Sequence, residues 1–199
     1  MNNFSEEFIN EIKEILDNLD LKILDEIVIE IKKVKERNGR IFFCGSGGGA
    51  GHSSHAAADF RKLLNIESYS ITDNVSELTA KINDDGWEDS YADILKASNF
   101  VEKDCLFVFS VGGGSINPPI SNQIVKAIDF VKTLNGTVLG VVGRDGGHTK
   151  KMANVALLIP VVSEATVTAH TEGMQAYIWH FLVSHPILNP EIPKWESIK

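Results

Sequence analysis

The first forty residues place apolar side chains at helical spacing. Apolar positions recur every three or four residues from Phe4 to Leu19, with charged residues between them, which predicts an amphipathic helix. Asp20 follows an interruption of this pattern and can cap a second helix, whose apolar positions run from Ile23 to Ile31. These positions cover more than one stripe, so we expect the second helix to contact more than one surface, including a second copy of the chain.

From Arg40 onward, short continuous apolar runs alternate with helical stretches. The runs predict strands at residues 41–44, 68–72, 106–109, 138–142 and 156–159. Helices are predicted over about 53–64, 74–98 with a break near 83–86, 119–134, and 166–184. Continuous apolar strands that alternate with helices are typical of a parallel sheet covered on both faces. We therefore predict an α/β fold, a three-layer sandwich around a five-stranded parallel sheet, preceded by two helices.

The length of 199 residues suits one well-buried domain. We expect a helical pair over residues 1–38, an α/β core over 39–185, and a tail over 186–199 that three prolines keep extended. The two cysteines, Cys44 and Cys105, lie in apolar runs without a CxxC spacing, which indicates reduced core residues.

Charge and hydropathy exclude some classes of partner. The formal net charge of −8 disfavours a nucleic-acid-binding surface, which needs a basic face. No apolar stretch approaches the ~20 residues that span a bilayer, and the first residues, MNNFSEEF, do not resemble a signal peptide. We expect a cytoplasmic protein that binds neither nucleic acid nor membrane.

Two glycine-rich loops follow predicted strands, at residues 45–51 and 110–115. Glycine lets backbone N–H groups approach a ligand closely, and the start of a following helix favours negative charge. Ser110 and Ser115 add hydroxyl groups, so the loops predict a phosphorylated or polyhydroxylated ligand. Tight turns alone are the alternative for either loop. A dinucleotide, with Asp73 as ribose ligand, is a further alternative, whereas the lack of GK[ST] excludes a P-loop.

Two pairs of polar residues are candidates for acid–base or metal chemistry. His55 and Asp59 are four residues apart, on one face of a predicted helix. Glu172 and His180 lie about 12 Å apart along an ideal helix, on either side of Ala176. The four residues would suit zinc or another divalent ion, and equally proton transfer, although a solvated helix pair is the alternative for His55 and Asp59. We interpret the remaining histidines as loop or surface residues: His52, His148, His170 and His185.

Several segments together resemble sugar isomerase (SIS) domains. They are CGSGGGAGHSSHAAADF, NDDG at 83–86, SVGGGS at 110–115 and GRDGG at 143–147. Among SIS domains the closest match is to the phosphoheptose isomerases, which convert sedoheptulose 7-phosphate to an aldoheptose 7-phosphate. The resemblance covers nearly the whole chain. It implies a single SIS domain over 1–199 with a flavodoxin-like sheet, a sugar phosphate as substrate, no nucleotide, and a homo-oligomer that we expect to be a tetramer.

The resemblance also implies roles for individual residues. His55, Asp59, Glu172 and His180 are expected to hold Zn²⁺ or another divalent metal, with Asp59 and His180 as the catalytic proton-transfer groups. The expected substrate-binding residues are Ser46, Gly48, Gly49, Asn83, Asp84, Ser110, Gly112, Gly113, Ser115 and Glu172.

The chain departs from the family pattern at several of these positions. Asp59 stands where the family has glutamate, and Glu172 where it has glutamine. Gly49 and the pair Val111–Gly112 replace hydroxyl residues, and about six extra residues lengthen the second loop around 117–122. An isomerase of a different sugar phosphate, or a non-catalytic SIS module that binds a sugar phosphate as a regulator, is therefore the alternative.

Overall fold

One parallel sheet organises the chain, as the alternating pattern predicts. The computed structural model describes residues 3–190 and contains a five-stranded sheet in the order β2-β1-β3-β4-β5. The strands are β1 (Ile41–Gly45), β2 (Ser68–Ser70), β3 (Cys105–Ser110), β4 (Thr137–Val142) and β5 (Val155–Leu158). All neighbouring strands pair in parallel. The predicted α/β fold with five parallel strands is confirmed.

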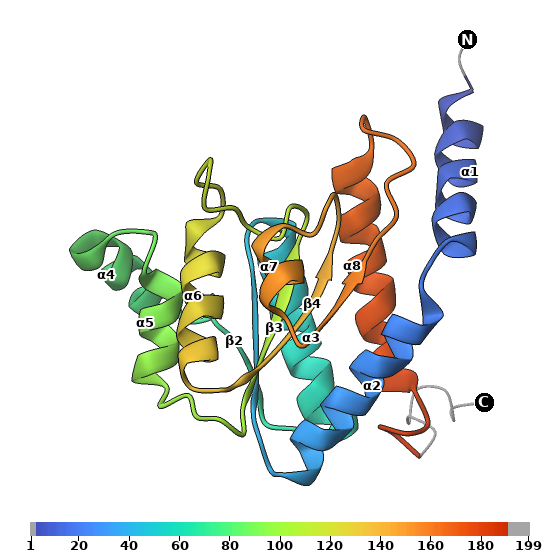
Figure 1. Ribbon diagram of the computed structural model, residues 1–199. Helices are drawn as coiled ribbons and strands as arrows, with labels where there is room; N and C mark the ends of the chain where they lie inside the picture. Colours follow the sequence, from blue (N-terminus) through green and yellow to red (C-terminus); the bar gives the residue numbers. More distant parts are fainter. Residues whose placement is uncertain (1–2, 191–199) are drawn as a thin grey trace.

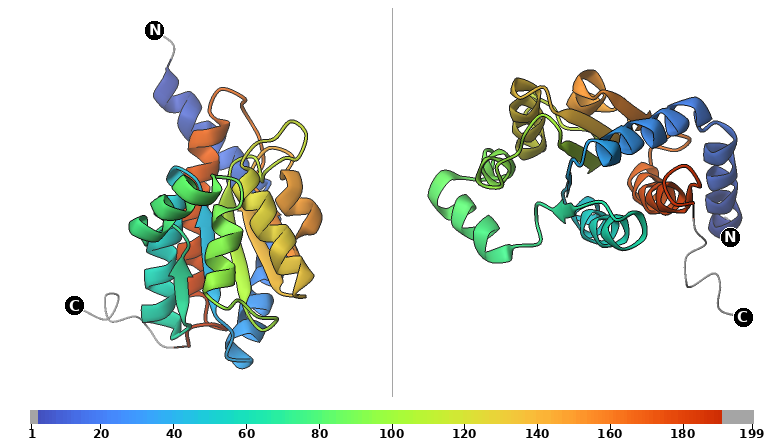
Figure 2. Two further views of the ribbon diagram at one scale, coloured as in Figure 1. Left: turned by 90° about the vertical axis from the view of Figure 1, so that its left-hand side faces the viewer. Right: turned by 90° about the horizontal axis from the view of Figure 1, so that it is seen from below.

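Helices cover both faces of this sheet (Figures 1 and 2). They are α1 (Phe4–Asp17), α2 (Leu21–Glu36), α3 (Gly48–Leu64), α4 (Val75–Asp85), α5 (Ser90–Ala97), α6 (Asn122–Thr133), α7 (Gly147–Met152) and α8 (Val167–Ser184). One apolar cluster joins the sheet to α2, α3 and α8, and a second joins it to α5 and α6. Phe43 and Phe107 belong to the first cluster, whereas Phe42 and Leu106 belong to the second, because successive strand residues point to opposite faces.

The two N-terminal helices form as predicted. The Asp20 carboxylate accepts hydrogen bonds from the backbone N–H groups of Lys22 and Ile23, so it caps α2. Buried side chains extend along α2 from Leu24 to Val34, whereas Ile15 is the buried residue of α1. Cys44 and Cys105 are buried free thiols, as expected.

Some boundaries differ from the prediction. Helix α3 starts at Gly48, because Gly47 makes the turn after β1 with a φ of +57° and the glycines that follow are already helical. The short helix α7 lies in a glycine-rich stretch with no apolar periodicity and was not predicted. Residues 185–190 fold into a turn with Leu188 buried rather than an extended tail, and the rest of the predicted tail lies outside the described residues.

Within residues 3–190, no helix has the length and apolar character that crossing a membrane requires.

Candidate functional site

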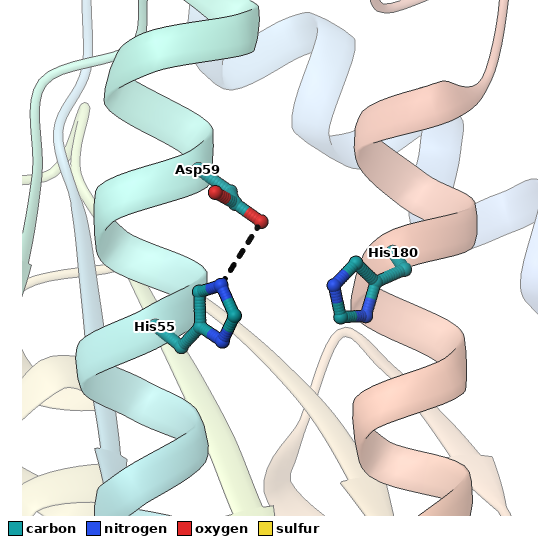
Figure 3. A group of neighbouring side chains, drawn as sticks. All are labelled: His55, Asp59 and His180. Carbon is teal, nitrogen blue, oxygen red and sulfur yellow. Dashed lines mark ion pairs between the residues drawn. The ribbon is translucent and has the colours of Figure 1, made fainter. Parts of the chain in front are cut away.

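Helices α3 and α8 lie side by side, and three of the predicted polar residues meet at their contact. His55 and Asp59 come from α3 and His180 from α8, as Figure 3 shows. One ligand atom from each residue lies within 4.8 Å of the other two. His55 Nε2 is 3.7 Å from the Asp59 carboxylate. The structure therefore joins residues that are more than 120 positions apart in the chain.

A hydrogen bond determines which nitrogen of His180 is available. Its Nδ1 lies 2.7 Å from the backbone oxygen of Ala176. A carbonyl oxygen only accepts, so Nδ1 carries a proton, and in the neutral ring Nε2 keeps its lone pair. This nitrogen can accept a proton or bind a metal ion.

The group is open to solvent on one side and supported by an aromatic ring on the other. His55 and His180 are exposed and Asp59 is half-buried. The His55 ring centroid is 4.4 Å from that of Trp179, which is 1% exposed. Two imidazoles and one carboxylate are ligands that zinc accepts, and three protein ligands leave a position for water or substrate. The residues present therefore fit a divalent metal ion.

Glu172 does not join this group within the described part of the chain. Its carboxylate lies against Gly48, where a Cβ atom would overlap it. Glu172 also faces His52: burial lowers the pKa of His52, while the nearby Glu172 carboxylate opposes this shift. The Nε2 atom of His52 is buried and has no partner among residues 3–190. The contact between α3 and α8 thus contains two groups of polar side chains. His52 and Glu172 lie near the first glycine loop, and His55, Asp59 and His180 lie farther along the two helices.

The first glycine loop packs directly on strand β3. A Cβ atom on Gly49 would lie 2.5 Å from the backbone oxygen of Phe109, and one on Gly45 would lie 2.7 Å from the same oxygen. Packing against β3 therefore requires glycine at both positions, independently of any contact that they make with a ligand.

Many polar groups of the second glycine loop are hydrogen-bonded within the loop or to neighbouring residues. The Ser110 hydroxyl accepts a hydrogen bond from Gly113 N–H at 3.0 Å. The Gly113 oxygen accepts from both the backbone and the hydroxyl of Thr149, at 2.9 and 2.7 Å. Ser115 pairs through its backbone with Ile120, so part of the predicted extra segment forms a small closed loop. Substrate binding by Ser46, Ser110, Gly112, Gly113 and Ser115 stays a prediction.

Asn83 and Asp84 lie at the end of α4, exposed and hydrogen-bonded to each other at 2.7 Å. In Figure 1 and in the right-hand view of Figure 2, α4 lies at one edge of the molecule, and α8 lies toward the opposite side, next to α1. Within one chain these two residues are therefore far from His180.

Two histidines interpreted as loop or surface residues are instead partly or fully buried against carboxylates. His170 is 5% exposed, and its Nε2 lies 2.6 Å from Glu11 of α1. His148 is half-buried, and its Nε2 lies 2.7 Å from Asp129 of α6. No local spacing could show this, because each partner lies on a distant element.

The sheet order, the glycine loops at the carboxyl ends of β1 and β3, and the polar group on α3 and α8 together define the SIS class of α/β proteins. Solved structures show the same fold. A phosphoheptose isomerase from Francisella tularensis matches with a TM-score of 0.78 and 22% identity over 96% of both chains. One from Neisseria gonorrhoeae matches with a TM-score of 0.77 and 23% identity, over 91% of this chain and 93% of that chain.

Sequence relatives identify the family. A phosphoheptose isomerase from Helicobacter pylori is 32% identical over 154 residues, which cover 75% of this chain and 76% of the relative. The chain therefore belongs to the phosphoheptose isomerase family. The match to the same enzyme from another strain is 34% identical over 130 residues and spans 64% of that relative's length. No protein-family model matches the chain.

Proposed function

We propose that this chain is an aldose–ketose isomerase that converts sedoheptulose 7-phosphate to D-glycero-D-manno-heptose 7-phosphate through an enediol. The observation that carries the proposal is the meeting of His55, Asp59 and His180. This group combines a carboxylate with an imidazole whose Nε2 is free, which are the two kinds of group that proton transfer near neutral pH requires. The phosphoheptose isomerases among its relatives support the substrate.

Asp59 moves a proton between the two carbon atoms of the substrate, and His180 moves a proton between their two oxygen atoms. The Asp59 carboxylate takes a proton from C1 and the C1–C2 double bond forms, while the proton of the C1 hydroxyl moves to the C2 oxygen, which gives the singly ionised enediol. Asp59 then returns its proton to C2, and the C1 oxygen becomes the carbonyl oxygen of the aldose. His180 Nε2 carries the proton between the two oxygens.

A divalent metal ion, with zinc as the first candidate, would be held by His55 and Asp59, and by His180 only when its Nε2 is not transferring a proton, because this nitrogen has a single lone pair. When bound, such an ion stabilises negative charge on the enediolate oxygens. Since a carboxylate has two oxygens, Asp59 can serve the ion with one and the proton with the other.

We further propose that the protein works in the cytoplasm as a single SIS domain assembled into a homotetramer. Phe4, Ile9 and Leu16 of α1 are 63%, 51% and 42% exposed. Exposed apolar side chains such as these suit contact with another copy of the chain. Within an oligomer, Asn83 and Asp84 of one copy can approach the α3–α8 site of another.

The proposal is tested by NMR with sedoheptulose 7-phosphate in deuterated water. We expect the wild type to produce an aldose and to exchange deuterium at C1. Asp59→Asn and His180→Asn should each lower kcat by about 10²–10⁴-fold, the usual contribution of a positioned acid or base. Asp17→Asn, which changes an exposed carboxylate at the end of α1, is the control and should leave kcat unchanged.

A second experiment, with a chelator, tests whether the reaction requires the metal ion. Activity should fall after chelation and return with added zinc. Turnover of the Asp59 and His180 variants within a few-fold of wild type would contradict the isomerase assignment. Binding of the sugar phosphate without turnover would indicate a regulatory module instead.

A further inference from the structure

One buried tryptophan lies against both histidines of the candidate site. Trp179 is 1% exposed and belongs to the apolar cluster that joins the sheet to α2, α3 and α8. Its ring centroid is 4.4 Å from that of His55 on α3 and 3.4 Å from that of His180 on α8. Since both histidines are exposed and Trp179 is buried, the indole ring closes the inner side of the group.

No hydrogen bond from residues 3–190 fixes the ring of His55, whose Nε2 is 3.7 Å from the Asp59 carboxylate. Histidines that bind metal ions commonly donate their other ring N–H to a carboxylate or a backbone oxygen, which fixes the orientation of the ring. His180 has such a bond, with the backbone oxygen of Ala176. The orientation of the His55 ring depends instead on ring contacts.

These ring contacts restrict the one torsion that hydrogen bonds leave soft. The χ2 angle of histidine has no sharp preference of its own. The indole plane is tilted by 56° to the His55 ring and by 31° to the His180 ring. Turning either imidazole about χ2 would drive its edge into the indole, which is itself closely packed in the core. The rings are thus held where one ligand atom each from His55, Asp59 and His180 lies within 4.8 Å of the others.

The indole N–H shows that Trp179 acts through its rings. Its Nε1 is buried and has no partner within the described part of the chain. An unpaired buried donor destabilises a fold, so an entirely apolar side chain would suit the core better. The contribution of Trp179 to the site is therefore its flat surface against the two imidazoles.

We propose that Trp179 is a positioning residue, which holds the imidazoles of His55 and His180 in the orientation that lets them bind a divalent metal ion together with Asp59. It acts through the two histidines and supplies no ligand atom itself. This inference rests on the proposed function, because it takes the group as a metal site.

The test measures binding of Co²⁺, a coloured substitute for zinc, to the protein without substrate. A titration gives the Kd of Co²⁺, and the absorption spectrum of the bound ion reports its coordination geometry. Trp179→Leu removes the flat surface, whereas Trp179→Phe keeps an aromatic ring and removes the unpaired N–H. Phe107→Leu is the matched control, because Phe107 is 0% exposed in the same apolar cluster and its ring contacts Phe43 and Phe109.

We expect Trp179→Leu to raise the Kd of Co²⁺ about 10–100-fold, the usual effect of removing a group that orients a metal ligand, and to change the absorption spectrum. Trp179→Phe and Phe107→Leu should each keep the wild-type spectrum and a Kd within about 3-fold of wild type, well below that effect. A merely structural role of Trp179 would instead weaken binding equally in Trp179→Leu and Phe107→Leu.

A fluorescence measurement leaves Trp179 in place and does not depend on the folding of its variants. The chain has three tryptophans, so changing Trp87 and Trp195 to phenylalanine leaves Trp179 as the only one. Bound Co²⁺ should quench most of its emission, because the indole lies against two of the ligands. The quenching should saturate at the same Co²⁺ concentration as the absorption.

Four results would overturn the inference: no binding of Co²⁺ by the wild type, unquenched Trp179 emission at saturating Co²⁺, an unchanged Kd in Trp179→Leu, or an equal loss of affinity in Trp179→Leu and Phe107→Leu. Its failure differs from failure of the proposed function. Turnover of sedoheptulose 7-phosphate by a protein that binds no Co²⁺ rejects this inference alone. An inactive protein whose Kd for Co²⁺ responds to Trp179 as expected rejects the isomerase alone.

Discussion

Three glycines at the start of α3 have different reasons to be glycine. Gly48 leaves room for the flexible end of Glu172, and Gly49 leaves room for the rigid backbone oxygen of Phe109. Gly51 lies in α3 with open space where a Cβ atom would be, and its φ is not positive. Adding a methyl group should therefore change the free energy of unfolding differently at each position of this glycine-rich motif.

Alanine at two of these positions should have opposite effects on stability. Gly49→Ala places its Cβ atom 2.5 Å from the Phe109 oxygen, and such overpacking costs about 1–3 kcal/mol. Gly51→Ala should stabilise the protein by about 0.5–1 kcal/mol, because alanine favours the helix. Urea unfolding measures both free energies, and a stabilised Gly49→Ala would show that the loop moves away from β3.

Helix α1 is attached to the rest of the chain by few buried contacts. Besides Ile15, its main anchor is Glu11, which accepts hydrogen bonds from Thr166 at 2.7 Å and pairs with His170 at 2.6 Å. Phe8 adds a ring contact with His170, with centroids 4.4 Å apart. The polar attachment of α1 therefore depends on one carboxylate, beside the apolar contacts of Ile15 and Phe8.

Acid should release α1 before it unfolds the sheet. The hydrogen bond with His170, followed by that from Thr166, holds the pKa of Glu11 below its ordinary value. A carboxyl group with a lowered folded-state pKa contributes stability above its unfolded pKa of about 4.3 and loses it as the pH falls through the folded value. Hydrogen exchange should show α1 amides losing protection in that range while β3 amides stay protected.

Glu11→Gln is the matched variant for this pH dependence. It removes the titrating group, so the protection of α1 amides relative to their intrinsic exchange rates should be lower at pH 7 and should no longer change with acid in this range. Equal pH responses of wild type and Glu11→Gln would show that another group controls the helix.

A buried ion pair connects elements across the whole molecule. Asp104, which is 0% exposed, precedes β3 and accepts hydrogen bonds from the backbone and guanidinium of Arg40, which precedes β1. It also accepts from Val101 N–H at 3.0 Å. Arg40 donates in turn to the backbone oxygens of Ser98 and Asn99. The ends of the two central strands opposite the site are thus joined to the loop after α5.

Removing this carboxylate should destabilise the entire fold. Asp104→Ala leaves the Arg40 guanidinium without its partner, and breaking a buried pair in this way costs about 3–5 kcal/mol. Glu36→Gln, which breaks an exposed pair with Lys32, should cost less than about 1 kcal/mol. The difference in urea midpoint between the two variants measures the effect, and equal midpoints would contradict it.

Local patterns predicted most of the secondary structure because burial and capping act over a few residues. The continuous apolar runs of the strands, the cap at Asp20 and the four-residue spacing of His55 and Asp59 are readable without any distant contact. Helix α7 was missed because Gly147–Met152 has no apolar periodicity, and the start of α3 because glycines weaken any helical pattern.

The amino-acid sequence by itself determined the α/β class, the parallel sheet and the residue types available for proton transfer, since these follow from short-range periodicity and chemistry. Only the tertiary structure decided that His180 meets His55 and Asp59, that Glu172 turns toward Gly48 and His52, and that Gln123 is buried beside Ser46. The physical reason is that helix packing and strand order set the distances between remote residues, and no local pattern encodes those distances.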